Sequence, residues 1–268
     1  MTEPGAAKSD PILVVDHVVK RFGGLTAVDV DHLEIDRGSI TALIGPNGAG
    51  KTTFFNLLTG FDSADSGHWT LDGRAIERLP SHRIARLGMV RTFQLTKVLS
   101  GMSVLENMLL AAEEQPGERF FVSLLPPLWR RRETEVAERA RGLLDQVGMA
   151  AKADDMAGTL SGGQRKLLEL ARVLMLDPSV VMLDEPMAGV NPALTESLLQ
   201  HVAALRDQGR TVVFVEHDMD VVHSISDWVV VLAEGRVIAE GTPAAVTADQ
   251  AVVDAYLGRG DTEAREDR

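Results

Sequence analysis

The sequence predicts an α/β protein with a mostly parallel sheet, an antiparallel β-subdomain before it and an α-helical insertion within it. Two apolar runs, Val180–Asp184 and Thr211–Val215, are typical of parallel strands that are buried on both faces. Near the N-terminus, Val28–Ile35 instead alternates apolar and polar residues, as a half-exposed antiparallel strand does. From Val104 to Val147 the pattern is helical. The order of these patterns indicates an α/β core that is interrupted by helices.

Shorter signals predict the remaining elements. Ser66–Gly73 indicates a strand that ends in an Asp-Gly turn, and Met89–Gln94 indicates a strand whose last residue leaves the sheet. Further elements are expected as strands at Ile12–Val15 and Asp227–Leu232, a helix at Pro192–Leu205 and a hairpin turn at Glu234–Arg236. The core should therefore comprise residues 12–94 and 178–258, with the helical insertion at about 95–177. Residues 1–11 and 259–268 are expected to be flexible tails.

Composition limits the classes of function. A chain of 268 residues can bury a sizeable core, and the absence of cysteine excludes thiolate metal sites and thiol catalysis. A net charge of −12 argues against general nucleic-acid binding, which depends on clustered lysine and arginine. No apolar run approaches the ~20 residues that span a bilayer, and the first residues do not have the pattern of a secretory signal. We therefore expect any connection with a membrane to be made through a partner.

A phosphate-binding loop is the strongest single motif. The pattern G-x-x-x-x-G-K-T follows the apolar run Ile40–Ile44 and precedes a helical segment, which is the context that the motif requires. Its residues are Gly45, Pro46, Asn47, Gly48, Ala49, Gly50, Lys51 and Thr52. The glycines allow backbone amides to surround phosphate oxygens, and Lys51 should reach the β- and γ-phosphates while the Thr52 hydroxyl binds Mg²⁺. The sequence therefore predicts a nucleoside-triphosphate site.

Two carboxylates close the apolar run that ends at Asp184. Asp184 is expected to hold Mg²⁺ through water, and Glu185 to orient and polarise the attacking water. An isolated strand-end Asp-Glu pair is more often a solvated strand terminus. Because the carboxyl ends of parallel strands share one edge of the sheet, the phosphate loop makes the functional interpretation the stronger one.

A second glycine-rich cap precedes the helical run that begins near Arg165. In Leu160–Gln164, Ser161 is expected to cap a helix whose glycines leave backbone amides bare. The simpler interpretation is a helix cap with a flexible approach. The functional interpretation is a second anion site that binds a γ-phosphate. In a dimer of two facing chains, the cap of each chain would contact the nucleotide that is bound by the other chain.

Two aromatic segments remain open at this point. Phe22, just before paired glycines, either packs in a turn or stacks on a flat base. The segment 120–129 is apolar and broken by prolines, which indicates either local packing at a helix–loop corner or a partner-binding patch.

The motifs occur together in the order and spacing of a known family. They are Gly45–Thr53, Gln94, Leu160–Gln164, Val180–Pro186 and His217. The chain resembles the ATP-binding subunits of ABC transporters over about residues 12–258. The resemblance implies a P-loop NTPase fold with a RecA-like core, an N-terminal antiparallel β-subdomain and an inserted helical subdomain that carries the signature pentapeptide.

The resemblance also implies roles for individual residues. Phe22 would stack on adenine, and Gln94 would contact Mg²⁺ and the water while sensing a transmembrane partner. His217 would contact the γ-phosphate, although a lone histidine after a strand is more often a capping or surface residue. The resemblance adds Thr53 to the residues that would bind the nucleotide. In a head-to-tail dimer, the nucleotide would also be contacted by residues of the second chain, namely Ser161, Gly162, Gly163 and Gln164.

Finer matches point to one subgroup of the family. They are Arg91–Gln94, Met187–Pro192, Glu216–Met219 and Ala255–Gly258, and they are similar to the branched-chain amino acid import ATPases of bacteria. Asn191 stands where most of the wider family has aspartate, which is usual in this subgroup. Urea and short-chain amide importers share much of the pattern, and so does the lipopolysaccharide-export ATPase, although the glutamine-loop and Asn191 details are less similar to it.

These resemblances imply an ATPase, with ATP and Mg²⁺, that converts ATP and water to ADP and phosphate. The expected partners are a second copy or a paralogous ATPase subunit, transmembrane permease subunits that contact residues 95–130, and indirectly a solute-binding protein. The chain would lie peripherally on the cytoplasmic face of the plasma membrane. A soluble ABC ATPase that acts on nucleic acid or ribosomes fits the acidic charge poorly, and a P-loop kinase has no use for the second cap.

Overall fold

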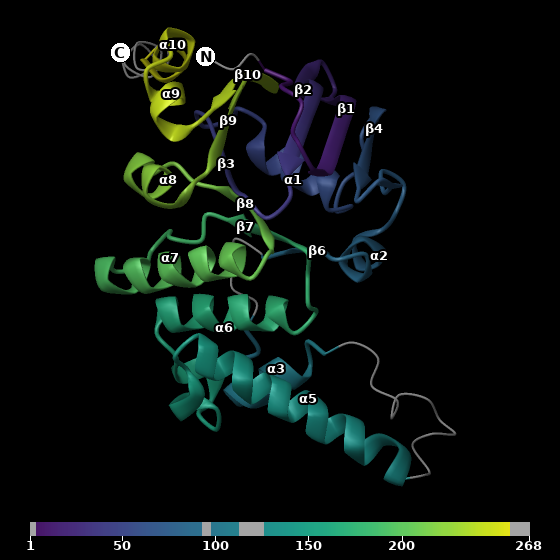
Figure 1. Ribbon diagram of the computed structural model, residues 1–268, viewed down its shortest axis with the longest axis vertical. Coiled ribbons are helices and arrows are strands. Elements are labelled where there is room, and N and C mark those ends of the chain that lie inside the picture. The colour runs from purple at the N-terminus through teal and green to yellow at the C-terminus, as the bar shows by residue number, and fades with distance from the viewer. Residues whose placement is uncertain (1–3, 93–97, 113–125, 258–268) are drawn as a thin grey trace. The chain divides into compact units, whose positions relative to one another are not determined.

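The structure is a computed structural model that describes residues 4–92, 98–112 and 126–257 (Figure 1). It divides into two compact units. The first comprises Met1–Arg91, Ser179–Pro186 and Val202–Arg268, and the second comprises Thr92–Pro178 and Met187–His201. The helical insertion expected at about 95–177 lies in the range of the first stretch of the second unit, and the second stretch, Met187–His201, begins two residues after Glu185.

A six-stranded sheet forms the centre of the first unit, in the order β10-β9-β3-β8-β7-β6. Its strands are β3 (Ile40–Ile44), β6 (Met89–Arg91), β7 (Val180–Asp184), β8 (Thr211–Val215), β9 (Trp228–Ala233) and β10 (Arg236–Gly241). All neighbouring pairs are parallel except β9 and β10. Strands β3, β7 and β8 are buried at every position, as the continuous apolar runs predict. The carboxyl ends of five strands therefore meet at one edge.

An antiparallel sheet of four strands completes the first unit, in the order β2-β1-β4-β5. Its strands are β1 (Pro11–Phe22), β2 (Leu25–Asp36), β4 (Ser66–Leu71) and β5 (Arg74–Ala75). The expected Asp-Gly turn joins β4 to β5, with φ of 50° at Asp72 and 72° at Gly73. Side chains from both sheets and from α1 (Lys51–Leu58) form one hydrophobic core, which includes Trp69 and Phe55. The predicted fold class is confirmed.

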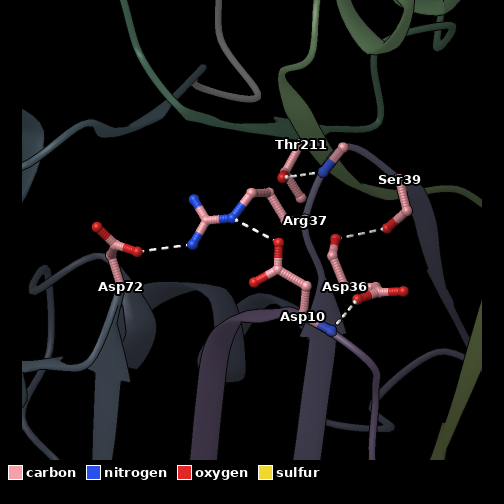
Figure 2. Close-up of polar contacts among 7 residues, drawn as sticks. Asp10, Asp36, Arg37, Ser39, Asp72 and Thr211 are labelled. Carbon is pink, nitrogen blue, oxygen red and sulfur yellow. Dashed lines mark hydrogen bonds and ion pairs between the residues drawn. The ribbon is translucent and has the colours of Figure 1, made fainter.

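Polar contacts join the two sheets near the amino ends of β1, β3 and β8 (Figure 2). The Nε of Arg37 donates to Asp10 Oδ2 at 3.0 Å, and its Nη2 donates to Asp72 Oδ1 at 2.6 Å. The backbone N–H of Gly38 donates to the Thr211 hydroxyl at 2.9 Å. These bonds connect β1, β2 and the β4–β5 turn of one sheet with β8 of the other.

The sequence predicts a flexible tail up to residue 11. In the structure, hydrogen bonds and an ion pair attach the tail to the rest of the first unit from Ala6 onward. The N–H of Ala6 donates to Glu240 Oε1 at 2.6 Å. The Lys8 ammonium lies 3.5 Å from the centroid of the Trp228 ring and 3.7 Å from Glu240 Oε2. Since Glu240 is only 2% exposed, this segment covers a buried carboxylate in β10.

Helices complete both units. In the first unit they are α1, α2 (Ser81–Arg86), α8 (Met219–Ile225), α9 (Pro243–Thr247) and α10 (Gln250–Leu257). In the second unit they are α3 (Val104–Leu109), α5 (Pro126–Gln146), η2 (Ala150–Lys152), η3 (Ala157–Thr159) and α6 (Gly162–Leu174), while α7 (Pro192–Asp207) begins in the second unit and ends in the first. Helices α3, α5 and α6 contact one another. Among the residues that the structure describes, no helix is both long enough and apolar enough to cross a bilayer.

Candidate active site

The phosphate loop connects β3 to α1, and two of its glycines are required by close backbone contacts. Gly45 has φ of 148°, and a Cβ at this position would lie 2.0 Å from the carbonyl oxygen of Leu232. Gly50 has φ of 98°, and its Cβ would lie 2.2 Å from the carbonyl oxygen of Ala27. No other residue type fits either position without moving the backbone. The loop is therefore fixed between the end of β9 and the start of β2.

The loop backbone and Lys51 together form a positively charged cradle. The N–H of Ala49 donates to the carbonyl of Pro46 at 3.1 Å, and Gly50 precedes the first residue of α1. The Lys51 ammonium donates to the carbonyls of Gly45 at 2.6 Å and Pro46 at 3.0 Å. An ammonium held over the loop at a helix N-terminus matches the charge of a triphosphate. The residues present fit that ligand.

Asp184 ends β7 with a side chain that is 1% exposed. Its Oδ2 lies 2.6 Å from the Nη2 of Arg91, whereas its Oδ1 is buried without a hydrogen-bond partner among the described residues. An anionic oxygen that is left over in this way is a suitable partner for a hydrated Mg²⁺ ion. Thr52, which is exposed on the first turn of α1, offers the hydroxyl that the phosphate-loop motif assigns to the same ion. The donor set therefore fits magnesium.

Glu185 follows directly and has φ of 45°. A non-glycine residue in this left-handed region is uncommon and carries a conformational cost. Its backbone N–H donates to the carbonyl of Val215 at 3.0 Å, so β8 holds the strained turn in place. Strain of this kind at a carboxylate that follows β7, at the carboxyl edge of the parallel sheet, supports a functional role for Glu185.

His217 lies just beyond β8, and its side chain is 68% exposed. The backbone N–H of His217 donates to Oε2 of Glu216 at 3.3 Å, and the Nδ1 atom of the His217 ring lies 3.7 Å from the same oxygen. Glu216 itself is buried, with 1% of its side chain exposed. The imidazole is therefore accessible while a buried carboxylate fixes its backbone.

The Phe22 ring is exposed to 51%, which favours stacking on a base over packing in a turn. It ends β1 opposite Leu25, which is also exposed. The Lys20 ammonium lies 5.0 Å from the ring centroid. An exposed aromatic ring with a cation beside it is a suitable platform for a purine.

Ser161 caps α6 in the second unit, as the sequence predicts. Its Oγ accepts from the N–H of Gln164 at 3.3 Å, and the Gln164 side chain accepts from the N–H of Ser161 at 3.0 Å. This reciprocal capping box satisfies the backbone amide of Gln164, as expected for a helix that Ser161 caps. Ser161 and Gly162 are exposed, so the end of the helix is accessible.

Gly163 is buried against the start of α7 within the same unit. A Cβ at Gly163 would lie 1.7 Å from Cδ2 of Leu194. Leu194 is positioned by Asn191, whose Oδ1 accepts from its N–H at 3.0 Å. The cap of α6 is thus in contact with the segment that follows Glu185, and Asn191 acts as a capping residue of α7.

The sequence interpretation overlooked three residues. Asn56 was not noted, and Arg91 and Glu216 were noted only as parts of subgroup motifs; in the structure Arg91 donates to both Asp184 and Asn56, and Glu216 accepts from the backbone N–H of His217. An arginine that ends an apolar strand was the available signal for Arg91. Gln94 lies outside the described residues, as do residues 113–125, which contain most of the apolar segment 120–129.

Comparison with known proteins identifies the family. Residues 28–188 match the model of the family described as ABC transporter, and residues 236–262 match that described as branched-chain amino acid ATP-binding cassette transporter. The high-affinity branched-chain amino acid transport ATP-binding protein BraF of Pseudomonas aeruginosa is 44% identical, over 93% of this chain and 99% of the relative. A probable branched-chain amino acid transport ATP-binding protein, LivG of Archaeoglobus fulgidus, is 43% identical over 94% and 97%.

Solved structures of ATP-binding cassettes from ABC transporters support the same family. An ATP-binding cassette of an ABC transporter in its ADP conformation has a TM-score of 0.81 at 38% identity, covering 93% of this chain and 100% of its own. A nucleotide-free ATP-binding cassette has a TM-score of 0.80 at 38% identity, covering 92% and 98%. The chain therefore belongs to the ABC transporter family, in the branch whose curated members are named as branched-chain amino acid transport ATP-binding proteins.

Proposed function

We propose that this protein hydrolyses ATP to ADP and phosphate and thereby powers a bacterial importer of branched-chain amino acids. One observation carries the enzymatic part: the phosphate loop follows β3, Asp184 and Glu185 follow β7, and His217 follows β8. Because β3, β8 and β7 are neighbours in the parallel sheet, all three groups lie at the same edge. A triphosphate, a metal-binding carboxylate, a base and a histidine can meet there.

The chain's own residues have distinct tasks in this proposal. The loop amides and Lys51 hold the β- and γ-phosphates, and Glu185 polarises the water that attacks the γ-phosphate. His217 contacts the γ-phosphate from the end of β8, and Gln94 is assigned to the same water. Thr52 and Asp184 would hold Mg²⁺, which would supply positive charge to stabilise the phosphates during transfer. Catalysis is then mostly positioning and electrostatic stabilisation.

A second ATPase subunit completes the site, either another copy or a paralogue. The exposed cap of α6 supports this, because Ser161 and Gly162 are accessible at a helix N-terminus of a kind that binds anions. Contact of this cap with the partner's γ-phosphate makes closure of the dimer depend on ATP, and hydrolysis releases it.

Transport also requires permease subunits in the membrane and a solute-binding protein. The names of the relatives support branched-chain amino acids as the cargo, and the chain would lie on the cytoplasmic face of the plasma membrane. The permease contact is assigned to residues 95–130, of which 98–112 and 126–130 are described.

Equilibrium binding of ATP to the full chain tests the nucleotide site. Wild-type protein should bind ATP, and Lys51→Ala should weaken binding by at least about 100-fold, because the central ammonium is lost. The matched control is Lys152→Ala, which removes an exposed lysine paired with Asp155 and should leave affinity unchanged. Equal affinity of Lys51→Ala and wild type would contradict the assignment.

Stimulation of ATP hydrolysis in the assembled transporter tests the cargo. The chain is co-purified with its membrane subunits, and leucine, isoleucine or valine is presented by the binding protein, with urea and short-chain amides as the comparison solutes. The proposal expects stimulation by the branched-chain amino acids alone. Stimulation by urea or an amide would reassign the cargo.

A further inference from the structure

Arg91 is a buried arginine at the carboxyl end of β6, and its guanidinium joins two other elements. Its Nη2 donates to Asp184 Oδ2 at 2.6 Å, and its Nη1 donates to Asn56 Oδ1 at 2.5 Å. Asp184 ends β7, whereas Asn56 lies in α1, the helix that begins at Lys51. One side chain therefore bonds both the carboxylate assigned to the metal and the helix that carries the phosphate loop.

The guanidinium is held on several sides. Its central carbon lies 5.5 Å from the centroid of the Phe55 ring, and 6% of the Arg91 side chain is exposed. A guanidinium presents its donors in a rigid planar fork, so two bonds to different partners set its orientation. The Asp184 carboxylate, bonded to this fork, is itself restrained in rotation.

The Arg91–Asp184 pair leaves Oδ1 of Asp184 without a hydrogen-bond partner among the described residues. Arg91 occupies Oδ2 of Asp184, and Oδ1 is buried with no hydrogen-bond partner in the described part of the chain. Burying a carboxylate away from water is costly, and the Arg91 guanidinium offsets part of this cost. Groups that orient a metal-binding side chain in this way commonly affect metal affinity almost as much as the metal-binding side chains do.

We propose that Arg91 is a positioning residue that presents Oδ1 of Asp184 to the hydrated Mg²⁺ of bound ATP and ties this carboxylate to α1. The inference rests on the proposed function, since it needs a magnesium–ATP complex at this edge of the sheet. Arg91 acts through Asp184 and does not touch the nucleotide. Its removal therefore weakens the contribution of magnesium to binding and leaves binding of metal-free ATP intact.

ATP binding to the full chain, measured in EDTA and then with increasing MgCl₂, separates these two effects. For Arg91→Gln, the dissociation constant in EDTA should stay within about threefold of wild type. The MgCl₂ concentration that gives half of the gain in affinity should rise at least about tenfold. Arg91→Lys should behave similarly, because it keeps the charge but loses the fork. Asn56→Ala, which keeps the ion pair, should shift this midpoint in the same direction by less.

The control is Arg37→Gln, which removes an arginine that also bonds two partners, near the amino end of β3. Its magnesium midpoint should equal that of wild type. An unchanged or lower midpoint in Arg91→Gln overturns the proposal, as does wild-type behaviour of Arg91→Lys or an equal loss of affinity in EDTA. If Arg91→Gln unfolds below the temperature of the assay, the test is made with Asn56→Ala instead. An unchanged magnesium midpoint in Asn56→Ala would then overturn the proposal. Failure of the wild type to bind ATP would instead contradict the proposed function.

Discussion

Two groups of arginine–carboxylate pairs in the first unit have opposite settings: one lies between the antiparallel sheet and the amino end of β3, and the other lies at the carboxyl ends of β6 and β7. Near the amino end of β3, Arg37 bonds Asp10 and Asp72, and the three side chains are 38%, 64% and 63% exposed. At the carboxyl ends, Arg91 bonds Asp184 with side chains that are 6% and 1% exposed. The bond lengths are alike at 2.6 Å for Arg37–Asp72 and Arg91–Asp184, so burial is the difference.

Burial changes what such a pair can do. An exposed ion pair is screened by water and contributes about 0–1 kcal/mol to stability. A buried pair loses its hydration, and breaking it by removing one partner costs about 3–5 kcal/mol. The amino-end contacts therefore join strands with little energetic consequence. Because replacing a whole buried ion pair by apolar side chains is often neutral or stabilising, we attribute the carboxyl-end pair to the proposed metal site.

The largest effect expected at the carboxyl ends comes from Gly45→Ala. The new Cβ would lie 2.0 Å from the Leu232 carbonyl oxygen at a φ of 148°, so the loop backbone must move. ATP affinity should fall by at least about 100-fold, roughly 2.7 kcal/mol, in an equilibrium binding measurement. As a control, Gly142→Ala in exposed α5 meets no atom within 4 Å and should stabilise the protein by about 0.5–1 kcal/mol. Undiminished affinity in Gly45→Ala would show that the loop is not held by β9.

Two helix caps of the same type allow a similar comparison within the second unit. Ser103 and Ser161 both form capping boxes, with Glu106 and Gln164. Replacing either serine by alanine should destabilise its helix by a similar amount, about 0.5–2 kcal/mol. Only Ser161→Ala should slow ATP hydrolysis by the assembled transporter, by at least about tenfold, because only this cap is assigned to a partner's γ-phosphate. Equal rates in both variants would reduce Ser161 to a structural cap.

Arg37→Gln is expected to have a small effect on stability alone. It removes both amino-end ion pairs, and the free energy of unfolding should fall by no more than about 1 kcal/mol in urea. The loss should shrink further at high salt, since the pairs are exposed. A loss of several kcal/mol would mean that exposure does not distinguish the two ends.

The smallest expected effect is a pH dependence at His32. Its hydrogen bond to Asp16 is the main cause that raises its pKa, with further contributions from Glu34, while burial opposes them. Because the pKa of His32 is higher in the folded state, protonation of His32 stabilises the folded protein. This contribution is fully present at pH values below the unfolded-state pKa of about 6.5 and is lost as the pH rises through the folded-state pKa. His32→Gln should therefore lower the melting temperature more at pH 5.5 than at pH 9, whereas exposed His82→Gln should not. An equal effect at both pH values would contradict the pKa shift.

The sequence predicted the parts of the site that depend on local backbone. Buried strands such as β7 and β8 were predicted as continuous apolar runs because both of their faces are covered. The loop between β3 and α1 was predicted from its glycine pattern and its flanking segments, and the structure shows that positive φ and close backbone contacts require glycine at Gly45 and Gly50. The cap at Ser161 followed from its position before a helical run.

The contacts that depend on distant residues could not be predicted. The Arg91–Asp184 pair joins positions 91 and 184, and only the adjacency of β6 and β7 brings them together. The positive φ of Glu185 likewise depends on the bond from its N–H to Val215 in a neighbouring strand. The bonded segment from Ala6 to Asp10 was missed because its composition resembles a flexible tail.

The most direct test of the account is the behaviour of Glu185→Gln. ATP binding and hydrolysis are measured for the wild type and the variant in the same assembled transporter. The account predicts that ATP affinity is retained, that turnover falls by at least about 100-fold because the water loses its base, and that the ATP-bound subunits accumulate as a closed dimer. Turnover of Glu185→Gln close to that of the wild type would contradict it.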